Sequence, residues 1–493
     1  MKKSVTDKSN IVEYIKKYKE EIRQGSGSYS LKEINEELFP ALKALNQGDK
    51  IYYVTERKQV SLLNFLQTKE NRECSVIILT GEGGMGKTVS MIATTEELCN
   101  EIENVNGRLT IPIYIPLYCL NDIEQDNLIS TYMLEEIWEG DKEAFDYFIK
   151  TNNLPYSVVF LLDGFNELRA SIKKNVGQEI RRLISRNRGK ILISSRSDSL
   201  LNLPVFHNME DDVSRLEIQP LSVDQIEEYL KACDMDYPEN NDRLQAVLSN
   251  PLMLMLYSNS EKYKNRERGT RRFLSWYYEP TNAGQIIWNF LQAQVLKIWH
   301  GERSKITIFN GYIAIHFVSA FIGYKMELDQ SFSISRNILK LWIKELHSQS
   351  DILHELINEL YGKGIEELFF EESDSEWELV ETNIMEILTS GLSMFISTHE
   401  GASNNEMKYE PCECKMKFMH QQFRDCYAAI YRKYIMLKKE WYLDDAWSKP
   451  IRPNIIRFCS DLFSKEELKD SVKELRKKQF EKDNVVLINI LNI

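Results

Sequence analysis

The chain has 493 residues, of which 43% are hydrophobic and 28% are charged, and its formal net charge is −12 at pH 7. This length exceeds what one hydrophobic core usually serves, so we expect two to four packed units of ordinary globular composition. The negative charge argues against broad electrostatic binding to nucleic acid or to anionic membranes, although it still allows a local basic groove.

Export and membrane signals are not visible in the sequence. Residues 1–8 have no apolar core, which argues against a signal peptide. The longest apolar stretch, near residues 312–324, contains His316 and is too short to span a bilayer. Eight scattered cysteines favour reduced thiols. We therefore expect a cytoplasmic protein with no membrane partner.

The first half of the chain alternates between predicted strands and helices. Residues 9–24 and 31–46 are predicted to be helical and form a short N-terminal segment, 1–50. The alternation follows from about residue 51 to 235 and is typical of a mostly parallel sheet. One strand carries Pro112 and Pro116, which makes it an awkward central strand because proline cannot donate a hydrogen bond. The predicted strands are 75–80, 109–117, 157–163, 190–195 and 214–218.

The second half is predicted to be mostly helical. Short β-like pieces at 378–398 and 415–419 could belong to a winged-helix unit. Residues 464–493 are expected to form a charged helix followed by an apolar run, and no fixed-period repeat is visible. The predicted helices are 222–232, 240–257, 283–300, 310–326 and 334–347.

The most specific motif follows the first predicted strand. Residues 81–88, Gly-Glu-Gly-Gly-Met-Gly-Lys-Thr, have the G-x-x-x-x-G-K-[ST] spacing of a phosphate-binding P-loop, between a strand and a helix. Glycines let backbone amides turn inward around phosphates, and the helix N-terminus adds its positive dipole end. Lys87 would supply charge to the β- and γ-phosphates, and Thr88 a hydroxyl for Mg²⁺. The predicted phosphate-binding residues are Gly81, Gly83, Gly84, Met85, Gly86, Lys87, Thr88 and Val89.

Two later strands end in residues that could complete the site. Asp163 ends the strand 157–163 and would lie beside the P-loop, because ligands bind at the carboxyl edge of such sheets. It would hold Mg²⁺, often through water. Glu167 could accept a proton from water or orient it. Arg196, after the strand 190–195, could detect the γ-phosphate. The predicted catalytic residues are therefore Glu167, Lys87 and Arg196.

These residues resemble a known family. Leu161-Leu-Asp-Gly-Phe-Asn-Glu-Leu168 resembles the Walker B segment of NACHT-domain NTPases, which belong to the STAND class of signalling ATPases. Five further segments are similar to family motifs in the same order: Ile193–Arg196 (sensor 1), Leu216–Leu230 (the segment after it), Asn250–Leu254 (the proline motif), Glu279–Trp288 (a segment of bacterial members) and Phe418–Ala429 (the winged-helix motif).

The resemblance implies an α/β P-loop core at 51–235, a small helical domain at 236–305, a winged-helix domain at 306–435 and a helical segment at 436–493. It also implies that Pro251 packs on the adenine base and that His420 contacts the β-phosphate of ADP. ATP or ADP with Mg²⁺ would then act as a switch, with slow hydrolysis. ADP would hold a closed monomer, and ATP would permit self-association in signalling or defence, in response to an unknown trigger ligand.

Some features depart from this pattern or favour alternatives. Asn166 stands where the family often has an acid, which leaves Glu167 to activate water and favours an alternative, an interaction module with a degenerate, essentially non-hydrolysing site. A GTPase lacks support because no Asn-Lys-x-Asp motif follows the P-loop. A mechanical AAA-type ATPase would need a substrate pore or ring contacts, which no residues identify. No effector domain or repeat array is recognisable at the ends.

Two further clusters could bind other ligands. Cys412, Cys414 and His420 could suggest a metal site, but the paired C-x₂-C spacing and a fourth ligand are missing. The basic and aromatic segment 262–278 could contact nucleic acid by charge and stacking. The acidic total charge favours an exposed interdomain loop instead.

Overall fold

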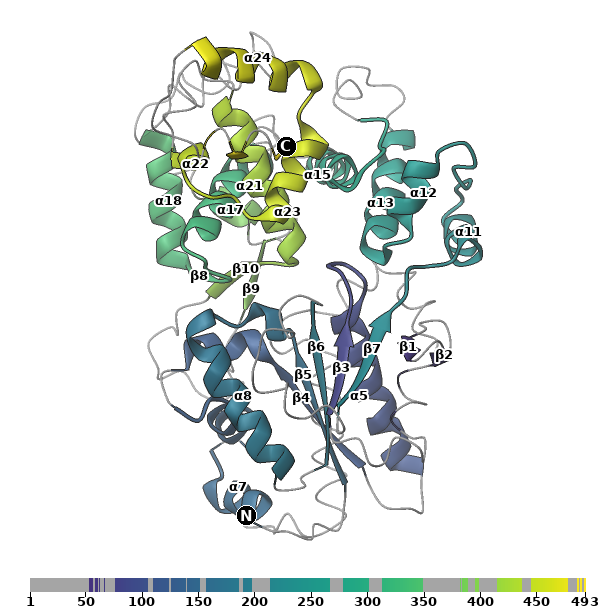
Figure 1. Ribbon diagram of the computed structural model, residues 1–493, viewed down its shortest axis with the longest axis vertical. Coiled ribbons are helices and arrows are strands. Elements are labelled where there is room, and N and C mark those ends of the chain that lie inside the picture. The colour runs from purple at the N-terminus through teal and green to yellow at the C-terminus, as the bar shows by residue number, and fades with distance from the viewer. Residues whose placement is uncertain are drawn as a thin grey trace. The chain divides into compact units, whose positions relative to one another are not determined.

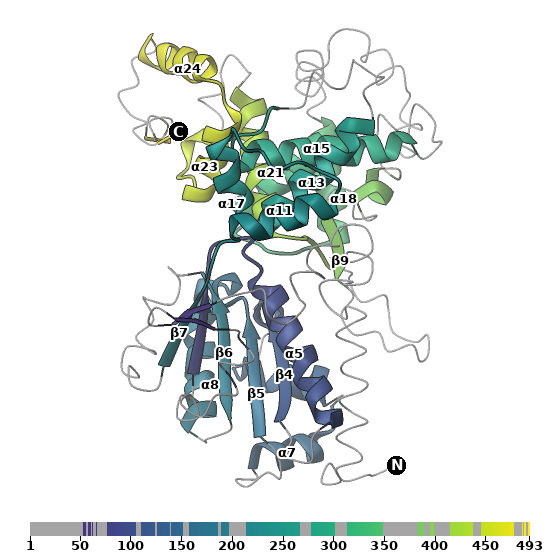
Figure 2. The same ribbon diagram turned by 90° about the vertical axis from the view of Figure 1, so that its right-hand side faces the viewer.

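The computed structural model forms two compact units, Met1–Leu221 and Ser222–Ile493 (Figures 1 and 2). The predicted helices at 9–24 and 31–46, Cys412, Cys414 and most of segment 262–278 lie outside the residues that the structure describes. Those described residues are 53–55, 58–60, 62, 66, 76–104, 110–123, 126–138, 140–150, 157–185, 189–196, 213–266, 278–300, 313–348, 382, 384–388, 395–398, 415–436, 445–477, 486, 488–489 and 492–493.

The first unit is built on a seven-stranded sheet in the order β2-β1-β7-β3-β6-β5-β4. The five strands from β7 to β4 are parallel, which confirms the α/β fold class, and β1 and β2 extend the sheet in antiparallel pairing. Each predicted strand is present within one residue at either end. The strands are β1 (Tyr53–Thr55), β2 (Lys58–Val60), β3 (Val76–Thr80), β4 (Thr110–Pro116), β5 (Ser157–Asp163), β6 (Lys190–Ser195) and β7 (Val213–Ile218).

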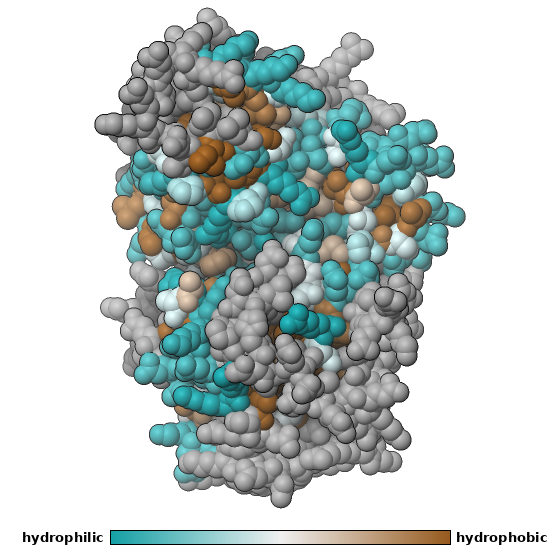
Figure 3. Space-filling model, viewed as in Figure 1, coloured by the Kyte–Doolittle hydropathy of each residue, from teal (hydrophilic) through white to brown (hydrophobic). Residues whose placement is uncertain are grey.

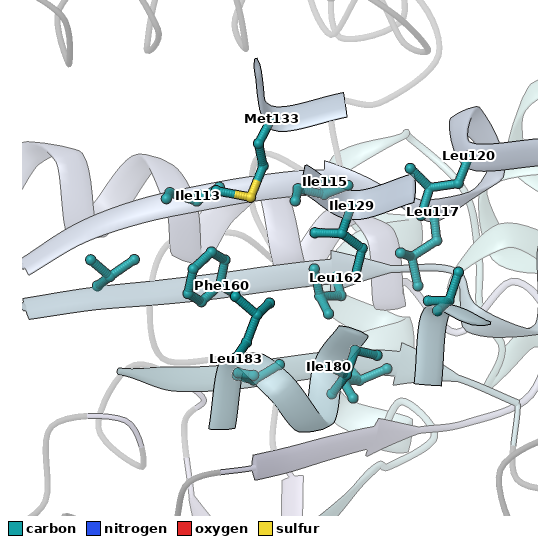
Figure 4. Packing of buried hydrophobic residues seen from close by; sticks show 14 of the residues in the cluster. Ile113, Ile115, Leu117, Leu120, Ile129, Met133, Phe160, Leu162, Ile180 and Leu183 are labelled. Atoms are coloured by element: carbon teal, nitrogen blue, oxygen red, sulfur yellow. The ribbon is translucent and has the colours of Figure 1, made fainter. Parts of the chain in front are cut away.

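Helices cover both faces of this sheet, so successive side chains of a strand enter different cores. Phe160 and Leu162 of β5 belong to one hydrophobic cluster, to which α6 and α8 also contribute (Figure 4). Val159 and Leu161 belong to the other, with residues of α5. The helical elements are α5 (Lys87–Asn104), η2 (Leu117–Asp122), α6 (Leu128–Tyr132), η3 (Met133–Ile137), α7 (Lys142–Lys150), η4 (Phe165–Glu167) and α8 (Ala170–Ser185).

The two prolines of β4 are explained by its position. Among the described strands, β4 stands at the end of the sheet, and its whole length from Thr110 to Pro116 pairs with β5. Pro112 and Pro116 stand at alternate positions, so their nitrogens face the same side of the strand. That side is the outer edge, where none of the described strands requires a donor.

The second unit is mainly helical, with one three-stranded sheet in the order β8-β10-β9. None of the helices in the described ranges combines the length and apolarity needed to cross a bilayer. The elements are α11 (Val223–Ala232), α12 (Asp242–Leu248), α13 (Pro251–Arg266), α15 (Ala283–His300), η6 (Ile313–Val318), α17 (Ser319–Leu328), β8 (Ile334–Ser335), α18 (Arg336–Ser348), β9 (Phe395–Thr398), β10 (Lys415–Phe418), α21 (Gln421–Met436), α22 (Asp445–Ser448), α23 (Pro453–Leu462) and α24 (Lys465–Lys477).

Two sequence predictions in this unit were wrong. The helix predicted at 240–257 is two helices, because Pro251 starts α13 and Asn250 caps it, accepting the N–H of Leu252 at 3.1 Å. Residues 384–388, predicted as β-like, are helical. Ile384, Met385, Ile387 and Leu388 are all buried while Glu386 is exposed, the spacing of a helix face.

A buried ion pair joins the central helices α17 and α21 of the second unit. Arg432 Nη2 lies 2.7 Å from Glu327 Oε2, and both side chains are buried. The same guanidinium donates to the carbonyls of Ala428 and Ala446, at 3.1 Å each. The charges are therefore paired and hydrogen-bonded, as a buried pair requires.

Hydrophilic residues dominate the described surface in the view of Figure 3, and hydrophobic residues form scattered groups among them. The exposed large hydrophobic residues include Ile338 and Leu341, three positions apart on α18. Small apolar groups of this kind are normal on protein surfaces.

Candidate functional site

The candidate site lies at the carboxyl edge of the parallel sheet in the first unit. β3 ends at Thr80, which pairs with Ser195 of β6, and Leu162 of β5 pairs with Ile193. Asp163 is therefore level with Ser194, one strand away from the start of the predicted P-loop. β6 lies between the strand that leads into the loop and the strand that carries the carboxylate.

The loop after β3 has the backbone conformation that its glycines allow. Gly84 and Gly86 have φ values of 81° and 88°, in the left-handed region that favours glycine. Between them, Met85 is buried in the hydrophobic cluster on the α5 face of the sheet. Its side chain anchors the loop to the core, so that only its backbone could serve a ligand. α5 begins directly afterwards, with Lys87 and Thr88 in its first turn.

Lys87 bridges the loop. Its ammonium donates to the carbonyls of Gly81 and Glu82, at 2.7 Å each. Burial, followed by the positive charge of Arg196, lowers the pKa of Lys87, whose net value is about 8. The charges of Asp163, Glu167 and Glu82 act in the opposite direction on this pKa. A phosphate beside the ammonium would add to that opposing effect and favour the charged lysine.

Two hydroxyls orient the buried carboxylate of Asp163. Ser194 Oγ accepts the N–H of Gly164 at 2.8 Å and donates its own proton to Asp163 Oδ1. The Tyr114 hydroxyl donates to Asp163 Oδ2 at 3.2 Å. These donors come from β6 and β4, the strands on either side of β5, so each carboxylate oxygen is addressed from a different side.

Glu167 lies in the short helix η4, directly after Asp163. The Glu167 N–H donates to Gly164 O at 2.8 Å, and Phe165 is fully buried beneath the turn. A Cβ on Gly164 would lie 3.2 Å from both Cδ and Oε2 of Glu167, so the glutamate side chain folds back over Gly164.

Asn121 of η2 holds the same turn from outside. Its Nδ2 donates to the carbonyl of Glu167 at 3.0 Å, and its Oδ1 accepts the N–H of Arg169 at 2.8 Å. The Arg169 guanidinium also donates to the Asn121 carbonyl at 3.3 Å. Both ends of the Asn121 amide are therefore bonded to the backbone on the two sides of Leu168.

Asn166, the departure from the family pattern, has a structural partner. Its Oδ1 accepts the backbone N–H of Arg196 at 3.2 Å. This bond ties the turn after β5 to the end of β6, where Arg196 is half-buried. Asn166 thus helps to fix Arg196, whose charge acts on Lys87.

Pro251 and His420 lie in the second unit. Pro251 is the first residue of α13. His420 precedes α21, and its Nδ1 accepts the N–H of Gln422 at 3.2 Å. The structure brings the P-loop, Asp163, Glu167 and Arg196 together in the first unit, and contact of Pro251 and His420 with nucleotide stays a prediction.

Three residues of the site were not assigned from the sequence: Tyr114, Asn121 and Ser194. Ser194 stands inside the Ile193–Arg196 segment, whose small polar residues at a strand end were a signal. Nothing in the sequence around Tyr114 or Asn121 indicated a role in the site, because their hydrogen-bond partners are 49 and 46 residues away along the chain.

The side chains present fit a hydrated divalent cation. The Thr88 hydroxyl and the Asp163 carboxylate offer oxygen ligands, which Mg²⁺ prefers, and Mg²⁺ in phosphate sites commonly uses one or two protein ligands with phosphate and water. Among the described residues, no cluster of three or more His, Cys, Asp or Glu side chains forms a separate metal site.

Comparisons with known proteins place one family on this region. The model of the NACHT domain matches residues 75–235. No curated protein matches the chain significantly.

Several solved structures share a faint overall likeness with the chain. The match to the structure of Drosophila ORC bound to DNA has 11% sequence identity and a TM-score of 0.32, and it covers 75% of this chain and 85% of the ORC chain. The Aeropyrum pernix ORC1 protein in complex with DNA is 12% identical, with coverages of 78% and 91% and a TM-score of 0.31. Cdc6p from Pyrobaculum aerophilum is 13% identical, with coverages of 76% and 90% and a TM-score of 0.27. Likenesses at this level carry no inference about function.

Proposed function

Because the chain contains a NACHT domain at residues 75–235, and therefore a P-loop nucleotide-binding NTPase fold, we propose that it binds ATP with Mg²⁺ and hydrolyses it slowly as a molecular switch. The observation that carries this proposal is the convergence of charges at one loop. Lys87 donates to the loop carbonyls of Gly81 and Glu82. The ends of β5 and β6 next to the loop are joined by the bond from Ser194 to Asp163 and by the bond from the Arg196 N–H to Asn166. The charges of Arg196, Asp163 and Glu167 all act on the pKa of Lys87. Such a cluster suits a polyphosphate and its metal.

Each side chain has a distinct task in this proposal. The backbone amides of the loop 81–86 and the first turn of α5 bind phosphate oxygens. Lys87 exchanges its two loop carbonyls for the β- and γ-phosphates. Mg²⁺, held by Thr88 and Asp163, would neutralise charge on the phosphates. Glu167 orients the attacking water, and Arg196 stabilises charge on the γ-phosphoryl group as it is transferred to that water.

The switch itself would involve the second unit. The order of elements from α17 to β10 is compatible with a winged helix. It is helix α17, strand β8, helix α18, the helical residues 384–388 and the antiparallel strands β9 and β10. We propose that Pro251 contacts the adenine and His420 the β-phosphate of ADP. Loss of the γ-phosphate would then change which arrangement of the units is favoured. ATP would permit self-association in signalling or defence, under the control of a trigger ligand.

The P-loop assignment is tested by Lys87→Ala. We expect the variant to lose ATP binding, measured by fluorescence titration with a labelled ATP analogue, because the phosphates lose their buried cation. Lys174→Ala, an exposed lysine on α8, is the matched control and should bind like the parent chain. Unchanged affinity in Lys87→Ala would contradict the proposal.

The alternative function is an interaction module whose nucleotide site does not hydrolyse. Asn166 favours this alternative. Its amide oxygen accepts the Arg196 N–H, so Glu167 is the carboxylate in that turn that could activate water. Single-turnover hydrolysis with and without Glu167→Gln separates the two functions. A slow rate that falls at least tenfold in the variant supports the ATPase, and equal background rates support the module.

A further inference from the structure

The segment from Tyr114 to Asn121 contacts the site at two points, although it carries no phosphate-binding residue. It comprises the end of edge strand β4 and most of η2. Leu117 and Leu120 within it are fully buried in the hydrophobic cluster of Figure 4. These leucines fix the backbone of the segment to the core, so the positions from which its polar side chains extend are held in place.

The first contact is made to the metal-holding carboxylate. Tyr114 pairs with Leu161 in the sheet, two residues before Asp163, so the Tyr114 and Asp163 side chains lie on the same face. A carboxylate oxygen can only accept, so the phenol donates to Oδ2 over 3.2 Å. Ser194 fixes Oδ1 in the same way, and the two hydroxyls together select one carboxylate orientation.

The second contact is made to the turn that carries Glu167. Asn121 bonds to the carbonyl of Glu167 and to the N–H of Arg169, at 3.0 and 2.8 Å. These bonds hold the backbone on both sides of Leu168, while Asn121 touches neither Asp163 nor the P-loop in any of them. η2 also packs against η4, the helix that contains Glu167.

We propose that Tyr114–Asn121 is the positioning segment of the NTPase site, in which Tyr114 orients the magnesium-holding carboxylate and Asn121 orients Glu167. The inference rests on the proposed function, since it assigns the metal to Asp163 and the water to Glu167. It goes further because it assigns the orientation of both Asp163 and Glu167 to one segment that itself binds neither the metal nor the water. Groups that orient metal ligands and catalytic side chains affect metal affinity and rate without touching substrate.

The two residues should affect different constants. Tyr114→Phe removes only the hydroxyl, so we expect a roughly tenfold higher Mg²⁺ concentration for half-maximal hydrolysis. Asn121→Ala releases the Glu167 backbone, so we expect a roughly tenfold to hundredfold lower kcat at saturating ATP and Mg²⁺. ATP affinity measured in EDTA should stay within twofold of the parent chain in both variants, because neither residue binds phosphate.

The experiment uses the full chain, with ATP and MgCl₂ as the titrated ligands. Tyr132→Phe is the matched control, since Tyr132 packs in the cluster on the opposite face of the same sheet. Asn121→Ser keeps a small polar side chain and replaces Asn121→Ala if the alanine variant folds poorly. An Mg²⁺ requirement within twofold of the parent in Tyr114→Phe, or a kcat within twofold in the Asn121 variant, would overturn the inference.

Failure of this inference is distinguishable from failure of the proposed function. If Lys87→Ala loses ATP binding while the Tyr114 and Asn121 variants behave like the parent chain, the inference alone is wrong. If Lys87→Ala binds ATP normally, or if hydrolysis by the parent chain does not depend on Mg²⁺, the proposed function fails and the inference fails with it.

Discussion

Ser194 shows how much a single hydroxyl can determine in a buried site. It is 1% exposed, accepts one backbone N–H and donates to Asp163. An alanine there would leave two buried polar groups without this partner. The cost of such loss is typically larger than the net gain from a hydrogen bond, because the groups cannot return to water.

We therefore expect Ser194→Ala to lower the free energy of unfolding of the first unit by about 1–3 kcal/mol. Urea denaturation followed by circular dichroism would measure this loss. Ser90→Ala is the matched control: Ser90 is also buried, but its hydroxyl donates to Gly86 O, a carbonyl that already accepts the Ser90 N–H. A loss no larger in Ser194→Ala than in Ser90→Ala would show that the Asp163 contact contributes little.

Residue contacts of this kind were the part that the sequence did not predict. The loop 81–88 could be found because its chemistry is carried by consecutive residues. The bond from Ser194 to Asp163 depends instead on β6 lying beside β5. The order of strands in a sheet cannot be predicted from the spacing of residues within a short segment. The amide of Asn121 is a stronger case, because nothing near it in the sequence distinguishes it from a polar residue of an ordinary turn.

At the scale of elements, a buried carboxylate joins α8 to α6. Glu179 of α8 is 5% exposed, and its Oε2 accepts the N–H of Ser130 at 3.2 Å. Burial raises the pKa of Glu179 above 4.5, while hydrogen bonds from the backbone of Ser130, Ile129 and Leu128 act in the opposite direction. The carboxylate therefore accepts from the first N–H groups of a short helix, which have no acceptor within that helix.

This raised pKa predicts a pH effect on stability. The folded chain binds more protons than the unfolded chain in the interval above the unfolded pKa of Glu179, so the stability of this contact falls as pH rises through that interval. Glu179→Gln cannot ionise, and we expect a flatter dependence of the urea midpoint on pH from about 4.5 upward. Glu135→Gln, at an exposed position, should reproduce the parent profile, and a parent-like slope in Glu179→Gln would contradict the assignment.

Elements were predicted best where the pattern was local. All five strands of the parallel sheet were found. β3, β5 and β6 are short, mostly buried apolar runs, and β7 shows the alternation of exposed Arg215 and Glu217 with buried Leu216 and Ile218. The break at Asn250 and the helix at 384–388 were missed, since apolar residues continue across the first and the second is too short to show a clear period. Both errors arose where capping or a few buried side chains determine the structure.

At the scale of the whole molecule, the chain divides into a unit that holds the P-loop and a unit that holds Pro251 and His420. The proposed switch requires His420 to reach ADP. We expect His420→Ala to reduce the increase in unfolding temperature that ADP produces, because a ligand stabilises the folded state less when it binds that state less tightly. Thermal denaturation with and without ADP measures the effect.

The neighbouring substitution Gln421→Ala is the control for this prediction. It lies at the start of the same helix and should preserve the shift caused by ADP. An unchanged ADP shift in His420→Ala would remove His420 from the switch, while leaving nucleotide binding by the first unit intact.

The prolines of β4 limit how copies of this chain could assemble. An outer strand edge normally offers a row of N–H groups on which a strand of another molecule can be laid. On β4, Pro112 and Pro116 remove two donors from that row. Continuous sheets running from one copy into the next are therefore disfavoured at this edge. The proposed self-association of the ATP-bound chain is therefore not expected to extend the sheet at β4.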